Sequence, residues 1–458
     1  MNRSEEKEQK STLRVCIATA FISTFMGSAL NLAIPNIGEA FDVSAALVGW
    51  VITAYMLSVA AMSVPFGKIA DTTGRRRIFL LGIFFFGFTG IISIFAWNIW
   101  LLIVCRVLQG LAGAMIFATN TAILLGAFPG SQRGNVLGKM TASTYVGLAA
   151  GPVAGGMLNH YFGWQSIFII SFVVSMVAFI TALRHLPKQE QLVTEGKQDI
   201  IGNSLYVMMI LLIMYGFSSV MTLTYGWAII VAGILVGVLF TWVELRAKNP
   251  VIHVRIFKHN LVYTLSNLAA LLNYGATFAI GYLMSIYLQV VMGYSSQTSG
   301  LILIAQPVIM ALLSPAMGRL SDKIAPYKLA SLGMALCTLS LIFFATVSIR
   351  TPLWAIILAL VVTGLGFALF SSPNTNAVMA CVEKKDYSIA SSILATMRSL
   401  GHTSSMAIVT LVVAISMGNT QLSKATPEML IKTMHIGFTI FTVLCFLGVL
   451  MSLKRKSS

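Results

Sequence analysis

Charged side chains are scarce in this sequence of 458 residues. They make up 10% of the chain, whereas hydrophobic residues make up 57%. Soluble globular proteins carry about 25% charged residues, so these few charges cannot cover a water-exposed surface of this size. The scarcity excludes a water-soluble enzyme, a disordered protein and a fibrous protein.

Several site signatures are also missing. The five cysteines are scattered and form no CxxC pair, so disulfide or metal roles are not expected. The chain has no GxxxxGK[ST] phosphate loop, which argues against a primary pump. Within the apolar runs there is no metal-spaced cluster and no nucleophile–base pattern, which argues against a membrane enzyme. We therefore expect no catalytic residue, no metal and no cofactor.

What the sequence does contain is a series of apolar runs. A helix of 18 or more apolar residues can cross about 30 Å of hydrocarbon. The first run is not followed by a small-residue cleavage site, so we expect it to be retained as a span. The pattern predicts an all-α polytopic membrane protein with fourteen transmembrane helices. The expected spans are 13–34, 46–66, 78–96, 99–124, 135–158, 165–184, 200–221, 224–243, 262–290, 298–317, 328–348, 353–379, 388–416 and 433–453.

The lysines and arginines predict the orientation of these spans. If the N-terminus is cytoplasmic, 25 of the 30 basic residues lie in cytoplasmic segments, three lie in outside loops, and Arg106 and Arg398 lie inside spans. Basic residues concentrate on the cytoplasmic side of membrane proteins. We therefore expect a multi-pass protein of the cell membrane with both termini cytoplasmic. The net charge of +16 is then a topology signal, and nucleic acid is not an expected partner.

Two longer charged loops, 185–199 and 244–260, divide the chain into six, two and six helices. An internal repeat supports this division. Gly-basic-apolar-small-Asp occurs at 67–71 and again at 318–322, each followed by further basic residues. Two related halves that meet around a central site are a common transporter architecture. The expected divisions are a cytoplasmic tail at 1–12, a six-helix bundle at 13–184, a linker at 185–260 with an inserted transmembrane hairpin at 200–243, a second six-helix bundle at 261–453 and a cytoplasmic tail at 454–458.

Four motifs in order resemble those of the major facilitator superfamily, in its fourteen-helix drug:proton antiporter branch of the EmrB/QacA type. They are WVITAYML at 50–57, GKIADTTGRRR at 67–77, RVLQGLAGA at 106–114 and GLAAGPVAGG at 147–156. The resemblance covers nearly the whole chain. It implies a secondary-active multidrug or small-molecule exporter that works by alternating access and proton-coupled antiport, with antibiotic resistance as an associated property.

The GKIADTTGRRR stretch predicts a conformational latch at a cytoplasmic interface. Asp71 can accept hydrogen bonds from helix N-termini or pair with nearby arginines, and Asp322 repeats it in the second half. The alternative is a turn whose basic residues only fix topology. The latch residues are expected to be Gly67, Asp71, Gly74, Arg75, Arg76 and Asp322.

Two arginines inside spans are costly in a membrane and indicate function. Arg106 lies about seven residues into its span and must face a cavity, a carbonyl or a partner, and the resemblance implies a role in proton coupling. Arg398 lies about ten residues from the cytoplasmic end, where a snorkelling side chain and a cavity-facing one are equally compatible with the sequence. His402, one turn further on, is a candidate proton carrier, although a packed helix residue is the commoner role.

The span 135–158 carries a glycine stripe. Gly147, Gly151 and Gly155 recur every four residues, which permits close helix contact. Pro152 favours a bend, and Gly156 completes the motif that resembles the antiporter motif of exporters. The pattern predicts a bent, tight contact that seals one side of the pathway, and at the least a packing helix.

Acidic residues are missing where the family often has one. In the first span Met26 occupies the position nine residues before Pro35 at which relatives often carry an aspartate, and all fourteen acids fall in tails, loops or helix ends. Coupling through a mid-membrane carboxylate is therefore not expected. The nearest acidic substitutes are Glu39 and Asp42 at the outer mouth, and a substrate that carries its own proton is the other possibility.

Polar and aromatic residues within spans outline a substrate pathway: Asn31, Tyr55, Asn120, Asn273 and Tyr282. We expect an apolar or amphipathic small molecule as the substrate and a monomer in the lipid bilayer as the working unit. The sequence leaves both coupling to protons and transport without them as alternatives. The competing hypothesis is export of one endogenous metabolite or lipid, of anionic character, attracted by Arg106 and Arg398.

Overall fold

A computed structural model describes residues 3–43, 45–186, 199–219, 225–247, 249–252, 255–417 and 426–455. Helices account for all regular structure in this part of the chain. The first bundle consists of α1 (Arg3–Phe41), α2 (Ala45–Thr73), α3 (Arg75–Ser93), α4 (Ile99–Ala127), α5 (Arg133–Ala150), the π-turn η2 (Gly151–Gly155), α6 (Gly156–Phe162) and α7 (Gln165–His185), with the short turn η1 (Gly130–Gln132) before α5.

The remaining helices form a hairpin and a second bundle. The hairpin consists of α8 (Ile200–Ser219) and α9 (Gly226–Glu244). The second bundle consists of α10 (Arg255–His259), α11 (Leu261–Thr277), α12 (Ala279–Ile286), the π-turn η3 (Tyr287–Val291), α13 (Ser296–Leu303), α14 (Ala305–Leu320), α15 (Pro326–Phe344), α16 (Leu353–Ala380), the turn η4 (Lys384–Asp386), α17 (Tyr387–Met417) and α18 (Pro427–Leu453).

Local sequence explains where several of these helices begin. Asn98 precedes α4 and its side chain accepts a hydrogen bond from the Leu101 backbone N–H at 2.8 Å, and Asn260 does the same for the Tyr263 N–H of α11 at 2.9 Å. Ser295 and Thr426 cap α13 and α18 in the same way. Such caps satisfy backbone donors that have no partner within the helix.

Twelve helices among the described residues are long and apolar enough to cross a membrane, two fewer than the fourteen expected. The two that are not among the twelve are the run α5–η2–α6 and α17. Both are helical, but α5 is rich in glycine and threonine, and α17 carries Arg398, His402 and several serines and threonines. This count covers the described residues, and side chains at 152, 410 and 414 within these two runs lie outside them, so the described part of the chain supports twelve spans and not the number fourteen.

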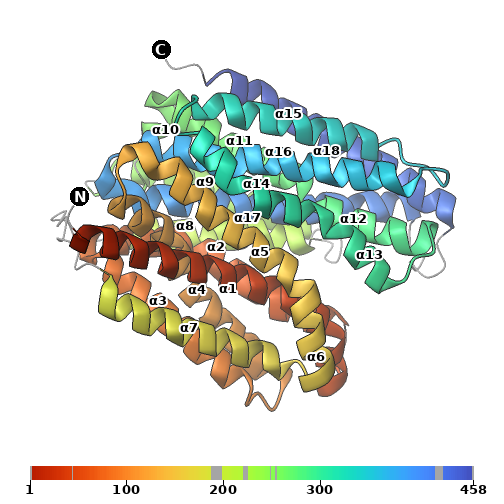
Figure 1. Cartoon of the computed structure of the whole chain (residues 1–458), viewed down its shortest axis with the longest axis horizontal. Coiled ribbons are helices and arrows are strands. Elements are labelled where there is room, and N and C mark those ends of the chain that lie inside the picture. The colour runs from red at the N-terminus through yellow and green to blue at the C-terminus, as the bar shows by residue number, and fades with distance from the viewer. Residues whose placement is uncertain are drawn as a thin grey trace.

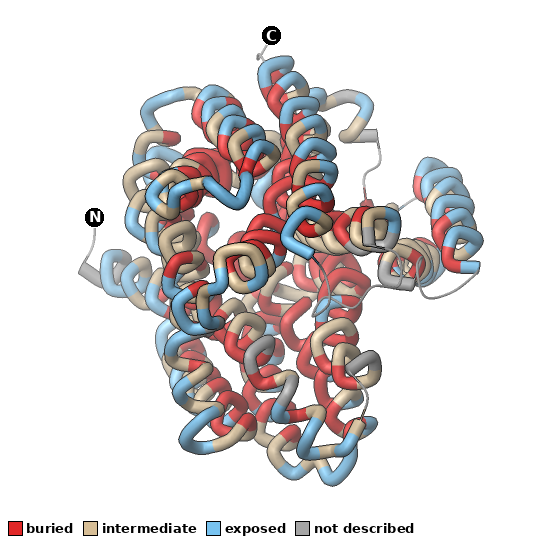
Figure 2. The backbone as a smooth tube through the Cα atoms, turned by 90° about the vertical axis from the view of Figure 1, so that its right-hand side faces the viewer, coloured by how far each residue is buried: buried red, intermediate tan, exposed pale blue. Residues whose placement is uncertain are grey.

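The helices run along the long axis of the molecule, and both chain ends lie at the same end of it, which we call the terminal end (Figure 1). The two bundles contact each other mainly through α5 against α14 and through α2 and α4 against α17. Buried residues gather in the interior, and exposed residues lie along the outer faces of the helices (Figure 2).

The inserted hairpin packs against α2 and α17, where the two bundles meet. Trp50 of α2 lies 5.9 Å from Tyr215 between ring centroids, and the Tyr206 and Thr396 hydroxyls are 2.9 Å apart. The hairpin therefore contacts both bundles. Most of the charged loop expected at 185–199 lies outside the described residues.

Two expected boundaries differ from the structure. The segment 1–12 was expected to be a tail, but α1 begins at Arg3 and the Thr12 side chain is fully buried. The segment 454–458 was also expected to be a tail, but the Arg455 side chain is fully buried in the second bundle. Both ends carry charges, which the sequence interpretation assigned to water.

Candidate functional site

A cavity of about 760 Å³ lies between the two bundles. Its walls come from α1, α4 and α5 on one side and from α11–α14, α16 and α17 on the other. The lining extends from Ser391, near the start of α17 at the terminal end, to Gly300 of α13 at the opposite end. Both halves of the chain therefore contribute to one space, as expected for the pathway of a two-bundle transporter.

The wall from the first bundle is lined by hydroxyl groups, most of which are already used within helices. Ser23 donates to the Thr19 carbonyl at 2.7 Å, and Thr24 donates to the Ala20 carbonyl at 2.9 Å and to the Thr144 carbonyl of α5 at 3.0 Å. Asn120 also lines the cavity, and its amide donates to the Cys16 carbonyl at 3.2 Å. Phe117, Tyr145 and Leu148 line this wall as well, so it combines hydroxyl groups with apolar side chains and carries no charge among its described residues.

The wall from the second bundle is aromatic and cationic. His402 stacks on Phe278 with 4.2 Å between ring centroids, and Tyr274 meets His402 edge-on at 5.5 Å. The Arg398 guanidinium lies over the Tyr274 ring at 4.9 Å, a cation–π arrangement. Phe367 lines the same wall, 5.8 Å from Tyr274.

Arg398 is the one charged side chain among the described residues that line the cavity, and no aspartate or glutamate is among them. Its Nε atom is buried without a hydrogen-bond partner in the described part of the chain. The structure thus places Arg398 in the cavity wall rather than at a membrane surface. His402 also lines the cavity, packed flat against an aromatic ring.

Arg106 lies elsewhere. Its side chain is 1% exposed, and it does not line the cavity. Its Nε donates to the Val51 carbonyl at 2.9 Å, Nη1 donates to Gln109 Oε1, and the guanidinium lies 4.3 Å from the centroid of the Tyr55 ring. A carbonyl, an amide and an aromatic face therefore surround this cation, so a snorkelling position does not describe it.

The expected pathway residues are only partly together. Asn120 lines the cavity, whereas Tyr55 lies beneath Arg106 and Asn273 is fully buried, where its Oδ1 accepts from Cys445 Sγ at 3.9 Å. Tyr282 is 44% exposed and does not line the cavity. The side chain of Asn31 lies outside the described residues. Polarity within a span alone did not separate cavity-facing residues from those that hold helices together.

Glu39 and Asp42 lie at the far end of α1 from the terminal end, and both are exposed. Neither lines the cavity. Asp42 has a left-handed backbone conformation, with φ of 50°, in the turn that follows α1.

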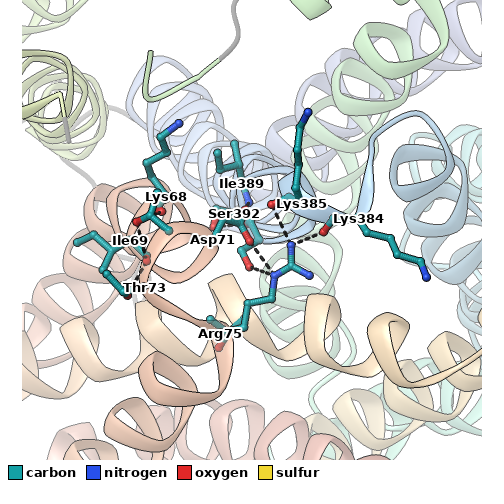
Figure 3. Close-up of polar contacts among 12 residues, drawn as sticks. Lys68, Ile69, Asp71, Thr73, Arg75, Lys384, Lys385, Ile389 and Ser392 are labelled. Carbon is teal, nitrogen blue, oxygen red and sulfur yellow. Dashed lines mark hydrogen bonds and ion pairs between the residues drawn. The ribbon is translucent and has the colours of Figure 1, made fainter. Parts of the chain in front are cut away.

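The first expected latch joins the two bundles at the terminal end (Figure 3). The Asp71 carboxylate, whose side chain is 4% exposed, pairs with Arg75 at 2.7 Å and accepts from the Ile389 backbone N–H at 3.1 Å. Arg75 also donates to the Ser388 hydroxyl at 3.0 Å, to the Lys385 carbonyl at 3.0 Å and to the Lys384 carbonyl. An aspartate of α2 and an arginine of α3 therefore hold the N-terminus of α17, where a negative charge is favoured.

The second contact repeats this arrangement from the other half. Asp322, which follows α14, accepts from the Gly134 backbone N–H at 2.6 Å and from the Asn135 N–H at 2.9 Å. These are the first residues of α5. The internal repeat in the sequence thus corresponds to two related contacts, in which an aspartate of each bundle caps a helix of the other.

The other expected latch residues differ in whether they contact the opposite bundle. A Cβ atom at Gly67 would lie 3.0 Å from the Ser388 carbonyl oxygen, so this glycine lets α2 and α17 approach closely. Gly74 has φ of 109° and separates α2 from α3. Arg76 does not join the bundles. It donates to the Leu186 carbonyl at 3.1 Å and to the Leu183 carbonyl at 2.9 Å, at the C-terminus of α7 in its own bundle.

The glycine stripe of α5 and η2 packs against α1. A Cβ at Gly147 would lie 2.6 Å from the Phe21 carbonyl oxygen, at Gly151 2.9 Å from the Ala29 nitrogen, and at Gly155 2.8 Å from the Ala29 Cα. The backbone around Pro152, whose side chain lies outside the described residues, forms the π-turn η2, and Gly156 begins α6. π-Turns commonly interrupt helices where a hydrogen bond is missing.

Arg455 is a buried cation that the sequence interpretation missed. It donates to Ser266 Oγ at 3.0 Å, to Asn374 Oδ1 at 2.6 Å and to the Ser452 hydroxyl. Burial lowers the pKa of this guanidinium to about 10, which leaves it charged at neutral pH. Its place after the last apolar residue of the chain gave no signal of burial.

The chain is similar in sequence to proteins of one family of membrane transporters. The model of the Major Facilitator Superfamily matches residues 16–244 and 267–457. The riboflavin transporter RibZ of Clostridioides difficile is 30% identical over 441 residues, covering 96% of this chain and 95% of that protein. The multidrug resistance protein Stp of Mycobacterium tuberculosis is 27% identical, with 87% of this chain and 75% of that protein covered. The methylenomycin A resistance protein of Bacillus subtilis is 26% identical, with 88% and 87% covered.

Among solved structures, the human organic anion transporter MFSD10 (TETRAN) has the same fold. The TM-score is 0.70 at 13% identity, and the match covers 99% of this chain and 100% of that chain. At this identity the likeness concerns the fold alone.

Proposed function

This chain belongs to the major facilitator superfamily of membrane transporters rather than to any class of enzyme, and on that premise we propose that it is a secondary-active exporter of small amphipathic molecules. The observation that carries this proposal is the cavity of about 760 Å³ whose walls come from both bundles. A site between two bundles can face either side of a membrane when one bundle rocks against the other.

The two aspartate contacts support alternating access in particular. Asp71 and Asp322 join opposite bundles at the terminal end, and both contacts must break if the bundles are to separate there. The distribution of basic residues assigns this end to the cytoplasm. In our proposal the structure is therefore the conformation that is closed to the cytoplasm.

The proposed topology is fourteen spans in the cell membrane with both termini cytoplasmic and a monomer as the working unit. It rests on the basic residues and on the helices α5 and α17, which are long enough to cross a membrane together with the twelve counted spans and which pack against both bundles. Reporter fusions at Ser131 and Asn159 should report opposite sides, and the same side for both would contradict the topology.

Proton-coupled antiport is the proposed energy source. No described acid lines the cavity, so the titrating group is expected to be Glu39 or Asp42 at the opposite end, or the substrate itself. Transport that is unchanged by an imposed proton gradient would remove this part of the proposal without touching the rest.

The test is uptake of a panel of neutral and charged amphipathic dyes into everted membrane vesicles, with and without a proton gradient. The Gly151→Leu variant should lose transport because a side chain there meets α1, whereas Gly130→Leu should retain it because Gly130 is exposed and nothing lies within 4 Å of a Cβ there. Equal uptake by vesicles with and without the protein would contradict the proposed function.

A second candidate is export of one metabolite with a planar ring system, and one relative is named a riboflavin transporter. The cluster of Tyr274, Phe278 and His402 on the cavity wall favours such a ligand. The same vesicles distinguish the two, because a specific exporter takes up one compound of the panel and a multidrug exporter takes up several.

A further inference from the structure

Arg398, which is half-buried, differs from the three buried arginines in its partners. Arg75, Arg106 and Arg455 each donate to protein oxygens. Among the hydrogen bonds of the described residues none involves Arg398, and its buried Nε has no partner. Buried polar atoms are normally hydrogen-bonded, so the buried Nε of Arg398 and its other donors, which line the cavity, indicate room for an acceptor that the described chain does not supply.

The surroundings of Arg398 determine the charge of that acceptor. It is the one charged side chain among the described residues of the cavity lining, and no carboxylate there neutralises it. An unneutralised cation in a space of low dielectric attracts anions and repels cations more strongly than it would in water. The guanidinium also presents a planar fork that matches a carboxylate or sulfonate.

The neighbouring side chains determine the rest of the ligand. The Tyr274 ring lies under the guanidinium at 4.9 Å, and His402 stacks on Phe278 at 4.2 Å one helical turn along α17. All four side chains line the same cavity. Aromatic walls of this kind favour flat rings, which pack face to face or edge to face against them.

We propose that Arg398, Tyr274, Phe278 and His402 form a subsite for planar aromatic anions, in which Arg398 binds the anionic group and the three rings contact the aromatic body. This inference rests on the proposed export function and gives it a substrate class. It also separates the two intramembrane arginines, because the hydrogen bonds of Arg106 are already made within the protein, to Val51 and Gln109.

Three probes of the same shape and different charge test this subsite: anthracene-2-carboxylate, anthracene-2-carboxamide and anthracene-2-carboxamidinium. Binding of each to the purified full-length protein is measured by fluorescence titration in detergent. We expect the carboxylate to bind at least about tenfold more tightly than the amide, and the amidinium to bind most weakly, because only the charge differs.

The variants separate charge from fold. Arg398→Gln should bring carboxylate binding down to that of the amide and leave amide binding within about threefold, while Arg398→Lys should retain part of the preference, because lysine keeps the charge without the fork. Arg350→Gln, which removes one exposed positive charge far from the cavity lining, is the matched control and should retain the full preference. Amide binding also reports whether the Arg398→Gln protein is folded.

Several results would overturn the subsite: equal binding of carboxylate and amide by the unaltered protein, no binding of any probe, or a preference that survives in Arg398→Gln. The same preparation, reconstituted in liposomes, is tested with the neutral dyes used for export. Transport of those dyes without a preference for the carboxylate would refute the subsite alone, whereas absence of all transport would refute the export function.

Discussion

The two halves of the molecule share their architecture and differ in their chemistry. At the terminal end each half contributes an aspartate that caps a helix of the other half, Asp71 on α17 and Asp322 on α5. In the cavity the halves diverge in charge, because the second contributes Arg398 and the first contributes no charged side chain among the described lining residues. The two halves therefore share the aspartate contacts that would break and re-form during transport, whereas their contributions to the cavity lining differ.

The closest approach between the halves occurs at glycines, and the two approaches differ in what a side chain would meet. A Cβ at Gly318 would lie 2.7 Å from Gly138 Cα and closer still to the Gly134 carbonyl oxygen, so backbone meets backbone. A Cβ at Gly67 would meet the side chain of Ser392, which can turn, and then the Ser388 carbonyl oxygen at 3.0 Å.

Gly318→Ala should therefore have the largest effect, a roughly tenfold or greater loss of transport, since overpacking of backbone against backbone leaves no side chain to adjust. Gly67→Ala should cost less. Transport in proteoliposomes measures both, and Gly130→Ala serves as the control because Gly130 is exposed and nothing lies within 4 Å of a Cβ there. A larger loss in Gly67→Ala than in Gly318→Ala would reverse this ranking of the two interfaces.

The next largest difference is expected between substitutions of Asp71 and Asp322, in how often the terminal end opens. Asp71→Asn leaves buried Arg75 without its counter-charge, whereas Asp322→Asn loses a charge that contacts only backbone N–H groups. Breaking a buried ion pair on one side costs about 3–5 kcal/mol, so Asp71→Asn should open the terminal end more often. Labelling of a cysteine introduced at Ser391 of the cavity lining reports the opening, and equal labelling in both variants would show that Arg75 adds nothing to the contact.

The two intramembrane arginines should respond in opposite ways to the same change. Arg106→Gln removes the guanidinium donors to the Val51 carbonyl and to Gln109 Oε1 in a fully buried site, which costs about 1–3 kcal/mol of folding stability. Arg398→Gln removes a cation that makes no hydrogen bond in the described chain, so its thermal unfolding temperature should stay the same or rise. The melting temperature of each variant is measured from the folded protein that remains on size-exclusion chromatography after heating. A lower melting temperature for Arg398→Gln than for Arg106→Gln would contradict this division of roles.

Much of the fold could be predicted from the sequence, because apolar length and charge distribution depend on the membrane and not on tertiary contacts. The repeat at 67–71 and 318–322 was recognisable from residue spacing, and it indicated that Asp71 and Asp322 lie in equivalent places of the two halves. The cavity lining could not be predicted in this way. Asn120 and Asn273 look alike in sequence, yet one faces the cavity and the other faces α18, and only helix rotation within the bundle decides between them.

Charge at the ends of bundles was misjudged for a related reason. Arg455 follows the last apolar run and was expected in a cytoplasmic tail. Arg76 precedes the expected span 78–96 and was expected at the latch. In the structure Arg455 is buried against Ser266 and Asn374, while half-buried Arg76 holds the C-terminus of α7. Sequence position indicates the membrane boundary, but not whether a long side chain turns back into the protein.

The last comparison concerns these two end contacts. Arg455→Gln loses hydrogen bonds from a buried cation to three side chains, whereas Arg76→Gln loses two bonds to helix-end carbonyls that water can replace. Charged hydrogen bonds contribute about 1.5–3 kcal/mol when buried and less where solvent reaches. We expect Arg455→Gln to lower the melting temperature by more than Arg76→Gln, with Lys454→Gln, an exposed neighbour, unchanged. Arg455 contacts the terminal end of the second bundle, as Arg76 contacts that of the first. Equal melting temperatures for Arg455→Gln and Lys454→Gln would show that the stability of the second bundle does not depend on the contacts of Arg455.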